Sequence, residues 1–157
     1  MAASLVLVMA VSGACTEPTV LSRDDVVSIA AAAGRHFLST QGPAELWPVV
    51  FVSDEYLGVS LDSSFAEALG LPDWQMQLGH RLDVTTNLDI VRDGGLLLEF
   101  VEPAPQGGRS ARLELNFSST AEFGGALVYS LRRDGAECWT VTRVNRIWTL
   151  GKTRLGD

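Results

Sequence analysis

The chain has 157 residues, a length that suits one hydrophobic core. With 46% hydrophobic and 20% charged residues, its composition excludes the polar, highly charged class of disordered proteins. The formal net charge of -7 disfavours general nucleic-acid binding, because phosphate backbones repel an acidic surface.

The first residues predict an export signal. The uncharged apolar run 5–11 is shorter than the about 20 residues that cross a bilayer, but it suits a cleaved signal. It ends in Ser12-Gly13-Ala14-Cys15, which resembles the lipobox of bacterial lipoproteins. Two features depart from that pattern, since Ser12 replaces a leucine-like residue and no Lys or Arg precedes the run.

The resemblance implies a lipid on Cys15 and a membrane-anchored protein of the cell envelope, in the periplasm or at the cell surface. Secretion after ordinary cleavage and an uncleaved N-terminus are the alternatives. We expect a signal peptide over 1–14, a tether over 15–21 and a single domain over 22–157. If Cys15 carries the lipid, Cys138 has no partner and is expected to be buried and inert; a Cys15–Cys138 disulfide is the alternative.

A helix is predicted from Ser22 to about Leu38. Ser22 can cap it, and Asp24 and Asp25 suit the positive end of the helix dipole. Apolar residues recur three and four positions apart, so one face should pack on the core. His36 lies near the edge of that face and is expected to be partly covered rather than a ligand or base.

The next elements are a strand and a short helix. The run 47–52 is continuous, apolar and rich in β-branched residues, which indicates a strand covered on both faces. A loop follows over 53–58. Ser64 and Glu67 are spaced as a capping box, and Gly70 closes the short helix that they begin.

From Leu82 onward, alternation of apolar and polar residues predicts an antiparallel sheet. Its basic residues alternate with apolar ones, which favours solvated strand faces. Leu113, Leu115 and Phe117 should face the core from one of its strands. Two hairpins are expected, between strands 88–91 and 96–100 and between strands 127–131 and 139–142.

The order of these elements, with Trp139-Thr140-Val141 in the last hairpin, resembles the cystatin-like, nuclear-transport-factor-two-like α+β class and exported bacterial proteins of this size. The resemblance implies an N-terminal helix packed on a curved antiparallel meander. Such folds host isomerases, hydrolases, ligand carriers and structural domains, so the resemblance does not select a function.

Catalytic motifs are scarce. The sequence has no phosphate-binding glycine loop, nucleophile elbow or metalloprotease motif, and two histidines disfavour a zinc site, so we expect no metal or cofactor. The weak catalytic candidates are His80, Asp83 and Tyr56. If Asp83 lay inside the curved sheet, desolvation would suit it to proton abstraction, with His80 or Tyr56 as the acid. The alternative is a surface ion pair between Arg81 and Asp83 on a strand.

Two functions from different classes follow. The first is a binding or interaction module of the envelope that presents a sheet face or the aromatic residues Trp74, Trp139 and Trp148 to an envelope protein or a small apolar ligand. Arg81 is a further binding candidate, and Asp54 either binds a ligand at a strand end or shapes its loop. The alternative is a small metal-independent enzyme that uses acid and base chemistry in a pocket under the sheet.

Overall fold

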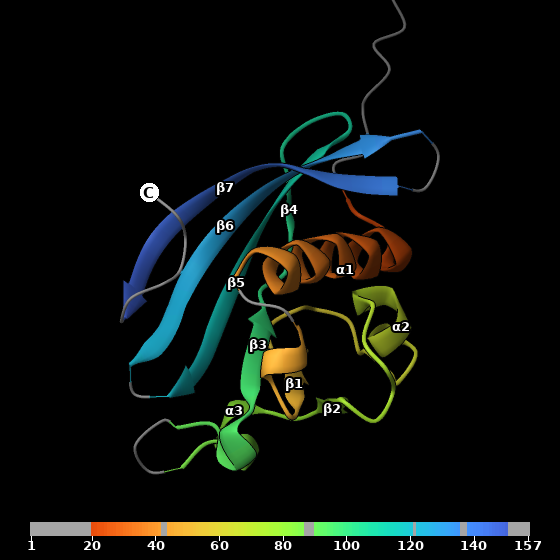
Figure 1. Ribbon diagram of the computed structural model, residues 1–157. Coiled ribbons are helices and arrows are strands. Elements are labelled where there is room, and N and C mark those ends of the chain that lie inside the picture. Colours follow the sequence, from red (N-terminus) through yellow and green to blue (C-terminus); the bar gives the residue numbers. More distant parts are fainter. Residues whose placement is uncertain (1–19, 42–43, 87–89, 121, 136–137, 151–157) are drawn as a thin grey trace, which may run out of the picture.

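The computed structural model describes residues 20–41, 44–86, 90–120, 122–135 and 138–150, so the predicted signal peptide and Cys15 lie outside the described residues. It has the expected α+β arrangement (Figure 1). The helices are α1 (Arg23–Thr40), α2 (Phe65–Leu69) and α3 (Arg81–Val84), with short 3-10 turns at Ala44–Leu46 and Arg92–Gly94. The strands are β1 (Val50–Ser53), β2 (Met76–Leu78), β3 (Leu96–Phe100), β4 (Ala104–Pro105), β5 (Ser110–Thr120), β6 (Phe123–Asp134) and β7 (Cys138–Leu150).

The seven strands form one open, mixed sheet in the order β2-β1-β3-β5-β6-β7, with β4 beside β5. The expectation of an antiparallel sheet from Leu82 onward is confirmed by the pairings among β3, β4, β5, β6 and β7. The sheet as a whole is not an antiparallel meander, because β1 is parallel to both β2 and β3. Parallel neighbours need long crossover connections. The segments that carry α2 and α3 supply them.

The two expected hairpins have different outcomes. The second one is confirmed, since β6 and β7 pair antiparallel over most of their length. The first is wrong: Arg92–Gly94 forms a 3-10 turn, and β3 pairs with β1 and β5 instead. The segment before that turn forms an isolated bridge between Thr85 and Val91, and the backbone N–H of Val91 donates to the carbonyl oxygen of Ser119 on β5.

Local signals at the helices are partly confirmed. Ser22 caps α1 in a full capping box with Asp25, as predicted. In α2 the predicted capping box is wrong, because Ser64 makes no cap bond and its backbone N–H donates instead to the Asp62 carboxylate. Gly70 closes α2 in the left-handed conformation at φ 75°, which suits glycine.

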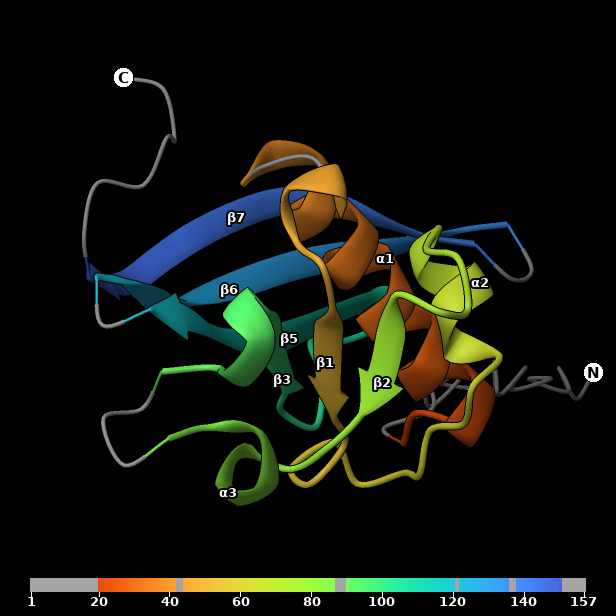
Figure 2. The same cartoon turned by 60° about the horizontal axis from the view of Figure 1, so that its bottom comes forward.

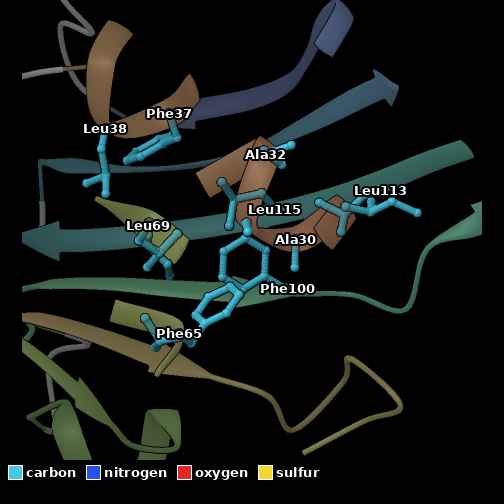
Figure 3. Close-up of a cluster of buried hydrophobic side chains, with 14 of the residues drawn as sticks. Ala30, Ala32, Phe37, Leu38, Phe65, Leu69, Phe100, Leu113 and Leu115 are labelled. Carbon is cyan, nitrogen blue, oxygen red and sulfur yellow. The ribbon is translucent and has the colours of Figure 1, made fainter. Parts of the chain in front are cut away.

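The inner face of the sheet, defined as the face that carries α1, is filled by side chains (Figure 3). Small alanines on α1 let the helix approach the strands closely. Phe37 packs on Phe117 with ring centroids 4.8 Å apart, and Phe65 meets Phe100 edge-on at 5.9 Å. A Cβ on Gly34 would clash with Leu69, so α1 and α2 also touch closely.

The outer face, opposite α1, is covered unevenly. A second small core is formed by Val49, Phe51, Val84, Val91 and Leu97. One of its members, Val84, belongs to α3, which lies apart from α1 (Figure 2). The strand β1 is therefore buried on both faces, as its continuous apolar sequence predicts. None of the helices in the described part of the chain is long and apolar enough to cross a membrane.

Candidate functional site: the open edge of the sheet

The predicted cluster around Arg81 folds as helix rather than strand. Residues 81–84 form α3, and Arg81 Nε lies 3.2 and 3.1 Å from the two carboxylate oxygens of Glu99 on β3, with a further bond from Nη2. The expected surface pair between Arg81 and Asp83 is thus replaced by a pair with Glu99, which is 3% exposed. Sequence reasoning missed Glu99, although a carboxylate inside the apolar run 96–100 was its signal.

The remaining catalytic candidates lie near solvent. Asp83 is exposed, so it lacks the desolvation that would suit it to proton abstraction. Tyr56 is 55% exposed in the loop after β1. His80 Nδ1 lies 3.5 Å from Glu55 Oε2, and both side chains are about half exposed to solvent. The structure therefore brings His80 and Arg81 to one end of α3, where the His80 side chain is 54% exposed.

Asp54 shapes its loop. Its carboxylate accepts a hydrogen bond of 2.8 Å from the backbone N–H of Leu61, and its carbonyl oxygen accepts one from Leu57. These bonds hold the loop between β1 and α2. The loop interpretation thus accounts for the conformation of Asp54 without a ligand.

A polar network that the sequence did not reveal joins α1 to the last hairpin. Asp25 Oδ1 accepts a hydrogen bond of 3.1 Å from Trp139 Nε1 and lies 3.3 Å from Arg133 Nη1. Partial burial raises the pKa of Asp25, but the hydrogen bonds from Ser22 and Trp139 and the charge of Arg133 outweigh it, so the pKa lies below the ordinary value. Asp25 therefore stays ionised and serves as a structural anchor rather than a base.

Beside this network lies a surface groove of about 420 Å³, a size that fits small ligands. Its walls combine Leu21, Pro105 and Trp139 with the charged Arg109 and the paired Arg133 and Asp25.

Two further aromatic groups, Tyr129 of β6 and His36 of α1, meet between the sheet and α1. Tyr129 is fully buried, and burial raises the pKa of its hydroxyl, which stays protonated. Its ring meets His36 edge-on with centroids 5.6 Å apart. His36 is half-buried, which confirms that it is partly covered.

The outer strand β7 is exposed at most of its described residues. It has 13 residues and ends the strand order, so among the described residues it pairs with β6 alone (Figure 1). The other end of the order, β2, has 3 residues. Large apolar side chains on β7 remain in water, with Val144 36%, Ile147 52% and Trp148 49% exposed. An uncovered edge of this length is a template for another strand.

Two irregularities in its pairing with β6 divide β7. Thr142 and Ile147 have no direct partner, and between them residues 143–146 pair regularly with 127–130. Directly opposed residues share a face. Arg146 opposes Leu127 of the inner core, whereas Arg143 opposes Ser130 on the outer face. The two arginines therefore project from opposite faces of the same edge.

The predicted aromatic and cysteine residues differ in accessibility. Trp148 lies beside Ala126 on the outer face, and Trp74, before β2, is 74% exposed. Trp139 is 7% exposed and bonded to Asp25, so little of its side chain is accessible at the surface. The expectation of a buried Cys138 is wrong, because Cys138 begins the edge strand and is exposed.

The described residues thus define an α+β domain with an open mixed sheet and a long uncovered edge strand. No family model matches the chain, and a search of curated proteins and of solved structures found no significant match.

Proposed function

We propose that the protein is a lipid-anchored interaction module of the cell envelope, and that it binds another protein through the edge of β7. The observation that carries the proposal is the 13-residue strand that ends the sheet and leaves Ile147 and Trp148 about half exposed. Strand edges bind extended polypeptides through main-chain hydrogen bonds, and the flanking side chains select the sequence.

Packing on the inner face favours binding over catalysis. An enzyme of the alternative kind needs a pocket between the helix and the curved sheet that holds a titratable group. Side chains of α1 and the strands occupy this space instead, including Phe37, Phe117 and Leu115. Asp25, in the first turn of α1, has a lowered pKa that makes it a poor proton acceptor.

The envelope location rests on the lipobox-like Ser12-Gly13-Ala14-Cys15. The finer fold assignment to the cystatin-like, nuclear-transport-factor-two-like class is part of the same proposal. It is supported by the way β5, β6 and β7 curve around α1 (Figure 1), whereas the parallel strands β1 and β2 depart from a simple meander.

The anchor is tested by the intact mass of the membrane-extracted full-length protein and of its Cys15→Ala variant. We expect a chain that begins at Cys15 and carries a diacylglycerol-sized addition, which the variant lacks. A soluble product that is cut elsewhere would remove the anchor from the proposal.

The binding surface is tested by a photo-crosslinking amino acid at Asn145, an exposed position in the regular part of β7, in cells of the organism that encodes the protein. The matched control carries the same group at Glu67, which is exposed on α2. We expect one defined partner from Asn145 and not from Glu67. Equal products from both positions, or none from Asn145, would refute the binding surface.

A further inference from the structure

The regular part of β7 offers a short template. Bulges twist and interrupt an edge, and those at Thr142 and Ile147 leave 143–146 as the segment where an added strand meets evenly spaced backbone groups. A nucleic acid lacks the alternating amide donors and acceptors that such an edge requires. The backbone therefore selects an extended polypeptide.

The segment 143–146 carries positive charges and no negative ones. Arg143 and Arg146 are both exposed and make no ion pair with another described residue. The sequence of β7 contains no acidic residue. An antiparallel second copy centred on 143–146 would place arginine opposite arginine, which destabilises strand pairs. Charge complementarity thus favours an acidic partner over self-association.

The spacing of the arginines adds a further requirement. They stand three positions apart and project from opposite faces of the sheet. Along any extended strand, residues three apart also point to opposite faces. A strand that lies beside 143–146 can pair with both arginines only if its own two acidic residues are three apart.

We propose, on the basis of the function proposed above, that β7 takes up an extended acidic segment of another protein as an eighth strand, with two carboxylates three positions apart that pair with Arg143 and Arg146. Apolar residues beyond the acidic pair then lie near Ile147 and Trp148, which are uncovered in the isolated chain. The edge arginines set the register, and the main chain supplies most of the hydrogen bonds.

The test uses the full chain and three synthetic peptides about as long as β7, all on the same threonine and valine background. One has two glutamates three positions apart, one has them two apart, and one has two lysines three apart. Binding is measured by fluorescence anisotropy of the labelled peptides and by hydrogen exchange of the β7 amides. We expect the first peptide to protect β7 and to bind at least about tenfold more tightly than the second, with affinity that falls as salt rises.

Charge-swap variants make the test specific. In R143E/R146E we expect affinity for the glutamate peptide to fall at least about tenfold and affinity for the lysine peptide to appear. The neutral variant R143Q/R146Q should show no preference for the glutamate peptide or for the lysine peptide. R112E is the matched control, because Arg112 is exposed on the outer face of β5, away from the edge, and should leave binding unchanged.

Equal binding of the two glutamate peptides, or unchanged binding by R143E/R146E, would overturn the inference. So would concentration-dependent dimerisation that protects β7, since a second copy would then be the occupant. The crosslink from Asn145 separates the two proposals. A captured partner without an acidic extended segment contradicts this inference and leaves the proposed function intact, whereas no capture contradicts both.

Discussion

Removal of Arg81 should destabilise the protein because it leaves a buried carboxylate without its counter-ion. The Glu99 side chain is 4% exposed, whereas that of Arg81 is 35% exposed. Loss of one partner from a fully buried pair costs about 3–5 kcal/mol. Because the Arg81 side chain is partly exposed, we place the cost of Arg81→Met below this range, at about 2–3 kcal/mol.

Substitution of the other partner, Glu99, should lower the free energy of unfolding by less. Glu99→Gln removes the buried charge and keeps a hydrogen-bond acceptor, and the partly exposed Arg81 can turn to water, so about 1 kcal/mol is expected. The double variant Arg81→Met/Glu99→Leu should recover part of the loss, because apolar side chains can replace a buried pair.

Urea unfolding followed by tryptophan fluorescence measures these differences as shifts of the midpoint at unchanged slope. If Glu99 needs its counter-ion, Arg81→Met lowers the free energy of unfolding more than Glu99→Gln does. A cost below about 1 kcal/mol for Arg81→Met, or the reverse order, would mean that the pair behaves as a surface ion pair.

Three further predictions concern other parts of the fold. The lowered pKa of Asp25 means that its ionised form stabilises the fold above its unfolded pKa near 3.8, and that this contribution is lost as the pH falls through the lower folded value; Asp25→Asn should therefore flatten the acid limb of a stability-against-pH curve. Gly34→Ala should lower the free energy of unfolding in urea by about 1–3 kcal/mol, because the added methyl group overpacks the contact of α1 with α2. An unchanged midpoint would mean that α2 moves aside without loss of stability. In a Cys15→Ala chain, Cys138 should react with a thiol reagent in the native state at nearly the rate measured in denaturant, whereas strong protection would contradict its exposure.

The elements that the sequence predicted are those with signals inside a short window. Ser22 and Asp25 lie three residues apart and form the capping box by themselves. The alternation of Leu113, Leu115 and Phe117 is confirmed by their burial on β5. Such patterns depend on neighbours along the chain. A short spacing is not sufficient by itself, because Ser64 and Glu67 are also three residues apart and form no capping box.

The failures come from contacts between distant segments. The four residues of α3 are too few for a helical period, and they are held by Val84 in the outer core and by Arg81 on Glu99, 18 positions away. The parallel pairing of β3 with β1 depends on the path of the connection, which alternation within a strand does not encode. The strand that the sequence predicts around His80 is therefore not formed, and residues 81–84 are helical instead.

The uneven cover of the sheet explains how an exposed edge is compatible with a stable domain. The strands β1 and β3 are buried on both faces, by α1 and α2 on the inner side and by the small core that includes Val84 of α3 on the outer side. Stability is thus concentrated around β1 and β3, which β5 and β6 separate from β7 in the sheet order. Among the described side chains of β7, only Trp139 and Val141 belong to the main core or pack against it, so substitutions at its exposed positions should cost little stability.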